Sequence, residues 1–264
     1  SGVTDFGLAR FTPAAFDAAG KGLIRAIAAQ AREKRDYEGN QIIASSIGLQ
    51  KGLRKFDNLA DKTIAIDVLG SAAHYQLMQI ARIKHVDPAR ITVKALGTPD
   101  AIARAVGTDQ VDAAIMPSLY ARELLMANQA KFLGWYSELD EQQLGALFVS
   151  KKMLETRRAA VEKFVHAYRR GAADYAAALL RTDRSSKRVS DIKSKEAATT
   201  IARYVYPDRG TDAAATVELG AYYIDPQARL DVADVARQIA WYKSQGLIDK
   251  AVDARTVVDA SFVK

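Results

Sequence analysis

The stretch KTIAIDVLGSAAH, residues 62–74, joins a strand to the start of a helix. Residues 63–68 are mostly apolar, which predicts a buried β-strand. Gly70 then makes a turn, and Ser71 is a preferred cap for an amphipathic helix over residues 72–83. A buried strand that turns directly into a helix indicates a parallel sheet covered by helices.

The alternation of strands and helices continues to residue 115. The pattern predicts strands over residues 91–95 and 111–115, with a helix over residues 99–106 between them. Strands that alternate with helices through short loops form parallel sheets with right-handed crossovers. Because such sheets bind ligands where their strands end, we expect a functional site near Gly70 and after residue 115.

Further elements flank this segment on both sides. Strands are predicted over residues 3–9, 23–29, 41–45 and 144–149, and helices over residues 13–19, 157–180, 196–206, 213–221, 232–246 and 254–261. Residues 181–188 carry mixed charge, which predicts a solvated loop. These patterns place the chain in the α/β class.

Composition excludes several classes of protein. Hydrophobic residues make up 49% of the 264 residues and charged residues 26%, which is ordinary for a globular chain. No apolar run reaches the roughly 18 residues of a transmembrane helix. The chain has no cysteine, which excludes disulfides, thiolate catalysis and cysteine-bound metals. The net charge of +7 is not gathered into a basic stripe, so we predict no nucleic-acid partner.

The motifs of common enzyme classes are also absent from the sequence. It contains no phosphate-binding loop, dinucleotide fingerprint or nucleophile elbow. His74, His85 and His166 lack the spacing of metal ligands, and the adjacent Asp140 and Glu141 need not converge on a substrate. We therefore predict no catalytic residue, no metal site and no cofactor.

Three segments together resemble the substrate-binding proteins of ABC importers, in the sulfonate/nitrate/taurine branch that is called NMT1/THI5-like. They are FDNLADKTIAIDVLGSAAHYQLMQIARIKHVDPARITVKALG (residues 56–97), VDAAIMPSLY (111–120) and LGALFVSKKMLETRRAAVEKFVHAYRRGAADYAAAL (144–179). The shared features are an L-x-D-K-x-I-A strand entry, a G-S-A-A-H helix start, a D-A-x-x-x-P end to the strand at residues 111–115, and a return strand before a long helix.

The resemblance implies a type II periplasmic-binding-protein fold, with two α/β lobes, mixed and mostly parallel sheets, and a ligand cleft between the lobes. Residues 62–148 are expected to form one lobe, and residues 1–61 with 149–264 the other. Members of the family carry two further strands and a helix ahead of the element that resembles GVTDFG, residues 2–7. We therefore expect the first part of the discontinuous lobe to be missing from this sequence.

The implied function is that of a solute-binding component. It captures a small, anionic organic molecule, such as a sulfonate or carboxylate, and delivers it to a membrane permease. The resemblance further implies an exported, periplasmic monomer, whose signal peptide is not part of this sequence. The alternative is an enzyme or a sensor built on the same fold, such as a relative from pyrimidine synthesis.

The candidate ligand contacts lie where strands end. Helix N-termini present free N–H groups to anions, which favours Ser71, Ala72, Ala73 and His74 as one wall of a site. The others are Ser118, which begins the helix after residues 111–115, and Arg10 and Thr12, together with Tyr136 and Glu138 before the return strand. For each there is a structural alternative: Ser71 only caps its helix, Arg10 forms a surface salt bridge, and His74, Tyr136 and Glu138 serve packing.

Overall fold

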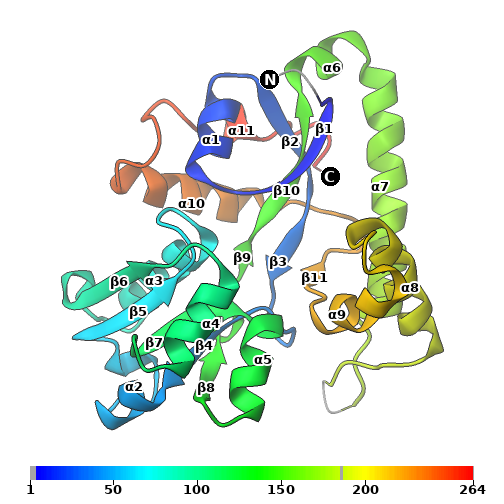
Figure 1. Ribbon diagram of the computed structural model, residues 1–264. Coiled ribbons are helices and arrows are strands. Elements are labelled where there is room, and N and C mark those ends of the chain that lie inside the picture. Colours follow the sequence, from blue (N-terminus) through cyan, green and yellow to red (C-terminus); the bar gives the residue numbers. More distant parts are fainter. Residues whose placement is uncertain (1–3, 185–186, 264) are drawn as a thin grey trace. The chain divides into compact units, whose positions relative to one another are not determined.

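The computed structural model describes residues 4–184 and 187–263, which form two compact units (Figure 1). Unit 1 comprises Ser1–Arg32 and Gln142–Lys264, and unit 2 comprises Glu33–Glu141. The chain therefore crosses twice between the units, at the short strands β3 (Ala31–Glu33) and β9 (Gln142–Gln143). Val3, in the predicted strand over residues 3–9, and residues 185–186, in the predicted loop, lie outside the described residues.

Unit 2 contains a five-stranded sheet with the order β6-β5-β7-β4-β8. Strand β5 (Lys62–Ile66) runs parallel to β6 (Ile91–Ala95) and to β7 (Ala113–Pro117), which confirms the parallel pairing predicted for this segment. Strand β4 (Asn40–Ser45) lies antiparallel between β7 and β8 (Ala130–Trp135). The sheet is therefore mixed rather than wholly parallel.

Unit 2 spans Glu33–Glu141, whereas the lobe expected from the sequence spans residues 62–148. Strand β4 was expected in the other lobe, but its Ile42 pairs with Ile115 of β7 and with Gly134 of β8. All six residues of β4 are buried, so this strand needs neighbours on both edges and helices on both faces. Strand β10 (Gly145–Ser150) instead pairs with strands of unit 1. Local sequence patterns do not say which sheet a strand joins.

Helices cover both faces of the unit 2 sheet. Ile42 and Ile43 point to opposite faces, and each lies in a different apolar cluster. Helix α3 packs on the Ile42 face, and helices α4 and α5 pack on the Ile43 face. The helices of unit 2 are α2 (Ser46–Gln50), α3 (Ala72–Ile83), α4 (Pro99–Gly107), α5 (Ser118–Met126) and the 3-10 turns η1 (Phe56–Asn58), η2 (Pro88–Arg90) and η3 (Tyr136–Glu138).

Unit 1 is built on an antiparallel sheet with the order β1-β10-β2, where β1 is Phe6–Arg10 and β2 is Ile24–Ala29. A second small sheet joins β11 (Tyr223–Ile224) to β3 and β9. The helices of unit 1 are α1 (Pro13–Gly20), α6 (Lys151–Thr156), α7 (Arg158–Leu179), α8 (Ile192–Val205), α9 (Ala214–Leu219), α10 (Val232–Ser244), α11 (Ala254–Val257) and the turn η4 (Gly210–Ala213).

Two predicted helices differ from the structure by four residues at one end. Helix α8 begins four residues before the predicted start at 196, because Asp191 and Ser194 form a capping box there. Helix α11 ends at Val257 instead of 261, since Val258 forms a parallel bridge with Ala26 of β2. In both cases a hydrogen-bonding partner, rather than helix propensity, decides the bound.

Asp112 holds together three segments of unit 2 at one end of β4. Its side chain is 2% exposed, and its Oδ2 accepts the N–H of Thr63 at 2.8 Å while its Oδ1 pairs with the Lys51 ammonium at 2.8 Å. Its backbone carbonyl accepts the N–H of Ser45 at 3.0 Å. A Cβ on Gly48 would lie 2.0 Å from that carbonyl oxygen, so only glycine allows this close approach.

We expect Asp112→Ala to lower the free energy of unfolding of unit 2 by about 3 kcal/mol, because it leaves the Thr63 N–H unpaired and the Lys51 charge without its partner. Asp112→Asn should cost less, about 1 kcal/mol, since an amide oxygen still accepts the Thr63 N–H. Urea titrations in a Trp241→Phe background, where Trp135 is the remaining tryptophan, measure this. The exposed Asp57→Ala is the control, and equal losses for Asp57→Ala and Asp112→Ala would contradict the assignment.

Candidate functional site

The candidate site lies at one edge of the unit 2 sheet. Strands β5 and β7 run parallel and end at this edge, and β4 begins there because it is antiparallel to β7. Asn40 pairs with Pro117, and the N–H of Ser118 donates to the carbonyl of Gly39 at 3.0 Å. Ser118 and the turn between β5 and α3 therefore follow the ends of two neighbouring parallel strands, which is where such sheets bind ligands.

The turn before α3 uses the Ser71 hydroxyl for its own structure. The Ser71 Oγ accepts the N–H of His74 at 3.2 Å and donates a short hydrogen bond to Asp67 Oδ1. In the part of the chain that the structure describes, the N–H groups of Ala72 and Ala73 have no acceptor. These are the first two amides of the helix, so the open donors belong to the backbone.

Two apolar residues at this turn were missed by the sequence analysis. Strand β5 ends at Ile66, so Val68, which was expected in the buried strand, lies with Leu69 in the turn, and these two residues are 55% and 58% exposed. An exposed apolar pair beside open helix amides offers a surface for the apolar part of a ligand. The signal in the sequence is the presence of two large aliphatic residues in a turn, where polar residues are usual.

His74 is a structural part of the turn. Its Nδ1 accepts the N–H of Gly70 at 3.0 Å, which requires the imidazole to carry its proton on Nε2. Burial lowers the pKa of His74 below its ordinary value of 6.5, and the nearby Asp67 carboxylate opposes this shift. His74 is therefore neutral at neutral pH, and it orders the backbone whose amides are open.

A buried polar network lies behind the same edge. The Glu33 carboxylate is 1% exposed and accepts the backbone N–H of Asn40 at 3.0 Å, and the Asn40 side chain donates to Gln76 of α3 at 2.8 Å. A Cβ on Gly39 would lie 2.0 Å from a Glu33 oxygen. No local pattern marks Glu33, because it is the fold that brings it to Gln76. The network holds α3 and the start of β4 in place.

Ser118 lines a surface pocket of about 290 Å³ in unit 2. We call it the Ser118 pocket. In the described residues the Ser118 hydroxyl has no hydrogen-bond partner, while its carbonyl accepts from Gln41 Nε2 at 3.4 Å. The rings of Phe132 and Trp135, 5.1 Å apart, form an apolar wall. The other lining residues are Glu38, Arg122, Leu125 and Met126. A hydroxyl beside aromatic rings suits a small organic molecule.

Tyr136 and Glu138 lie in η3, and the structure favours the packing alternative for the first. The Tyr136 side chain is fully buried in the apolar cluster on the α3 face of the sheet, so its ring is not open to stack on a ligand. Glu138 is exposed, and its carbonyl accepts from the Arg35 guanidinium at 3.0 Å. Neither belongs to the turn before α3.

Arg10 and Thr12 lie in unit 1, at the end of β1 and the start of α1. Arg10 is exposed and forms no ion pair within the described residues; its guanidinium lies 5.3 Å from the centre of the Tyr222 ring. The salt-bridge alternative for Arg10 is thus not observed there. Thr12 caps α1, since its Oγ1 accepts the N–H of Ala15 at 3.3 Å.

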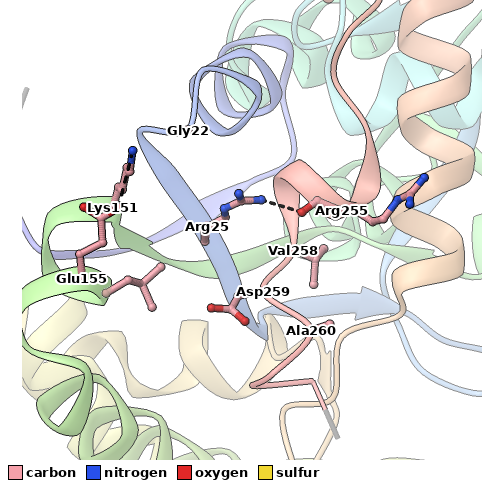
Figure 2. A pocket seen from close by; sticks show the side chains of 9 residues that line it. Gly22, Arg25, Lys151, Glu155, Arg255, Val258, Asp259 and Ala260 are labelled. Carbon is pink, nitrogen blue, oxygen red and sulfur yellow. Dashed lines mark hydrogen bonds and ion pairs between the residues drawn. The ribbon is translucent and has the colours of Figure 1, made fainter.

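A second pocket, of about 470 Å³, lies in unit 1 and is lined by charged side chains (Figure 2). Arg25 donates to the carbonyl of Arg255 at 2.6 Å, and Lys151 pairs with Glu155 at 3.6 Å. Because its cations already have partners, this pocket offers a weaker case for a ligand than the edge of unit 2.

Residues 4–184 and 187–263 contain no group of three or more acidic or histidine side chains arranged to hold a metal ion. Within the same residues, no helix has the length and apolar character needed to cross a membrane.

Comparisons with known proteins identify relatives of this chain. Residues 40–178 match the family model described as NMT1/THI5 like. The fold is similar to the periplasmic aliphatic sulphonate binding protein SsuA from Escherichia coli, with TM-score 0.71, 14% identity, and coverage of 98% of this chain and 76% of that chain. None of the curated proteins compared by sequence matches the chain.

Two further solved structures share the fold. One is the alkanesulfonate-binding protein SsuA from Xanthomonas axonopodis pv. citri bound to MOPS, with TM-score 0.65, 19% identity, and coverage of 97% and 81% of the two chains. The other is the desulfurization enzyme DSZB, with TM-score 0.60, 14% identity, and coverage of 97% and 83%. The same fold thus carries both binding proteins and an enzyme.

We expect an NMR titration to give His74 a pKa below 6.5, and Asp67→Asn to lower it further because the variant removes the charge that favours the imidazolium. As the pH falls, His74 takes up a proton in the unfolded chain before it does so in the folded chain. The contribution of neutral His74 to stability is therefore present above pH 6.5 and is lost as the pH falls further. A pKa above 6.5 would show that burial does not dominate, and a rise in Asp67→Asn would show that the Asp67 charge does not favour the imidazolium.

Proposed function

The chain belongs to the NMT1/THI5-like family, and on this premise we propose that it is the solute-binding component of an ABC importer. It captures a small organic anion, of the sulfonate or carboxylate class, and delivers it to a membrane permease. The proposal includes a periplasmic location and a monomeric state, which are expected of such a component.

The open amides of Ala72 and Ala73 carry this proposal. They lie at the positive end of the α3 dipole, and two N–H groups side by side match two oxygens of a carboxylate or sulfonate. A hydrogen bond to a charged group contributes about 1.5–3 kcal/mol. The Asp67 carboxylate in the same turn opposes an anion, and its hydrogen bond from Ser71 reduces that repulsion.

The surroundings of these amides support an organic ligand over a bare inorganic ion. Val68 and Leu69 are exposed beside the turn, whereas the aromatic wall of the Ser118 pocket lies on β8, beyond β7 and β4. Covering such surface contributes roughly 25 cal/mol per Å² of apolar area. We propose that the alkyl or aromatic part of the ligand lies against Val68 and Leu69.

Arg10 and Thr12 are also proposed as ligand contacts. The Arg10 guanidinium has no carboxylate partner in the described part of the chain, so it is available for an oxyanion. The fold relatives agree with this ligand class, since the Escherichia coli protein binds aliphatic sulphonates and the Xanthomonas protein was bound to MOPS.

The second candidate is an enzyme built on the same fold. The observation that favours it is the likeness of the chain to the desulfurization enzyme DSZB. The two candidates differ in what happens to the ligand: a binding protein returns it unchanged, whereas an enzyme converts it.

Thermal shift and calorimetric titration with alkanesulfonates, nitrate, aliphatic and aromatic carboxylates and pyrimidines test the proposal. We expect an organic anion to raise the melting temperature, and Ala72→Pro to weaken its binding by about tenfold or more, because proline removes one N–H. Proline is tolerated as the first residue of a helix, and Ser71 already has the extended backbone (ψ 174°) that must precede it.

Ala72→Ser is the matched control, since it keeps the N–H and should bind as the wild type does. Equal binding by Ala72→Pro and wild type would exclude the α3 amides as contacts. The absence of stabilisation by any member of the panel would overturn the binding role, and steady conversion of one of them would favour the enzyme.

A further inference from the structure

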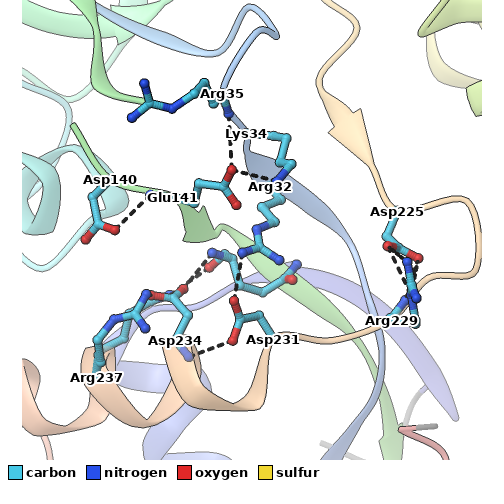
Figure 3. Close-up of polar contacts among 12 residues, drawn as sticks. Arg32, Lys34, Arg35, Asp140, Glu141, Asp225, Arg229, Asp231, Asp234 and Arg237 are labelled. Atoms are coloured by element: carbon cyan, nitrogen blue, oxygen red, sulfur yellow. Dashed lines mark hydrogen bonds and ion pairs between the residues drawn. The ribbon is translucent and has the colours of Figure 1, made fainter. Parts of the chain in front are cut away.

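Both crossing segments are tied to the first turn of α10 (Figure 3). On β3, the Arg32 guanidinium donates to Asp231 Oδ2 at 2.7 Å. Asp231 is the cap of α10, and its Oδ1 accepts the N–H of Asp234 at 2.9 Å. The segment that leaves unit 1 is therefore anchored at the residue that begins this helix.

On β9, Asp234 and Gln238 hold both backbone groups of Gln143. Asp234 Oδ2 accepts the N–H of Gln143 at 2.6 Å, and Gln238 Nε2 donates to the Gln143 carbonyl at 2.8 Å. Gln238 Nε2 also donates to Asp234 Oδ2 at 2.8 Å. The side chains of Asp234 and Gln238 are fully buried, so water does not compete for these bonds.

Gln143 links the two crossing segments to each other. Its Nε2 donates to the carbonyl of Ala31 at 3.2 Å and to that of Gly145 at 2.9 Å. The N–H of Leu144 also donates to the Ala31 carbonyl, at 2.9 Å. Loosening Gln143 from α10 therefore loosens the contact between β9 and β3 as well.

We propose that the first turn of α10 is a pH-dependent clamp on the two crossing segments, more firmly closed when Asp234 is neutral and opened more readily when Asp234 is ionised. The clamp concerns the mobility of the crossing segments and does not depend on which ligand the chain binds. Its parts are Asp231, Asp234 and Gln238 on α10, Gln143 on β9 and Arg32 on β3.

The charges around Asp234 set the pH range. Burial raises the pKa of Asp234 to about 6, although the hydrogen bonds from Gln143 and Gln238 lower it, and the like charge of Asp231 adds to the effect of burial. Arg237 opposes both, with its guanidinium 2.9 Å from Asp234 Oδ1. Arg32, the remaining charged group in these contacts, is paired with Asp231. Gln143 and Gln238 carry no charge.

The direction of the pH dependence follows from the linkage between proton binding by Asp234 and opening of the clamp. Opening the clamp exposes Asp234 to water, where its pKa returns toward 3.8, so the closed form binds the proton more tightly than the open form. Opening is therefore suppressed at low pH and becomes easier as the pH rises toward 6. Each pKa unit of difference is a factor of ten, which gives roughly 30-fold more opening at pH 7.5 than at pH 4.5.

Amide hydrogen exchange on the whole chain tests this. After correction for the intrinsic rate, we expect the protection of Gln143 and Leu144 to fall by roughly 30-fold between pH 4.5 and 7.5. Asp234→Asn should remove this dependence and stay protected at pH 7.5, because the amide is neutral and still accepts the Gln143 N–H. An unchanged pH dependence in Asp234→Asn would overturn the proposal.

If Asp234→Asn disturbs the fold, two further variants test the proposal. Arg237→Gln removes the cation that lowers the pKa of Asp234, so it should move the midpoint of the transition to higher pH. A midpoint that stays or falls contradicts the clamp. Asp225→Asn removes a carboxylate that pairs with Arg229 at 2.9 Å and, within the described residues, does not act on the pKa of Asp234 (Figure 3), so it should leave the midpoint unchanged.

Discussion

The insertion of β4 between β7 and β8 is the constraint on which the rest of the structure depends. Because β4 precedes the parallel strands in sequence, the chain must enter unit 2 to form it and return after β8. Because β4 is antiparallel to β7, it begins at the edge where β5 and β7 end. One pairing choice therefore brings the incoming segment, the α3 amides and Ser118 to the same edge of unit 2.

Buried carboxylates stabilise both ends of β4 and the crossing strand β9. Asp112 joins the end of β4 to β5, Glu33 joins its beginning to α3, and Asp234 holds the crossing strand β9 to α10. Each is nearly inaccessible to water and accepts a backbone N–H, so its desolvation is offset by hydrogen bonds. Asp234 differs in one respect, because burial outweighs its partners and raises its pKa to about 6.

Much of the local structure could be predicted from the sequence. The strand and helix over residues 62–83 have strong apolar periodicity and a clear cap at Ser71, and the structure forms both. The same holds for the long helix predicted over residues 157–180, which is α7. Strands β3, β8 and β9 were not predicted, because they are short or irregular and form only where a partner strand is present.

The sequence by itself determined the α/β class, the family and the helix start at residues 70–74, because these depend on apolar spacing and on capping residues that are neighbours in the chain. Only the tertiary structure decided that β4 belongs with β7, that Asp112 accepts the Thr63 N–H, and that Asp234 holds Gln143. Each of these depends on groups that meet in space, and the distance along the chain carries no information about such a meeting.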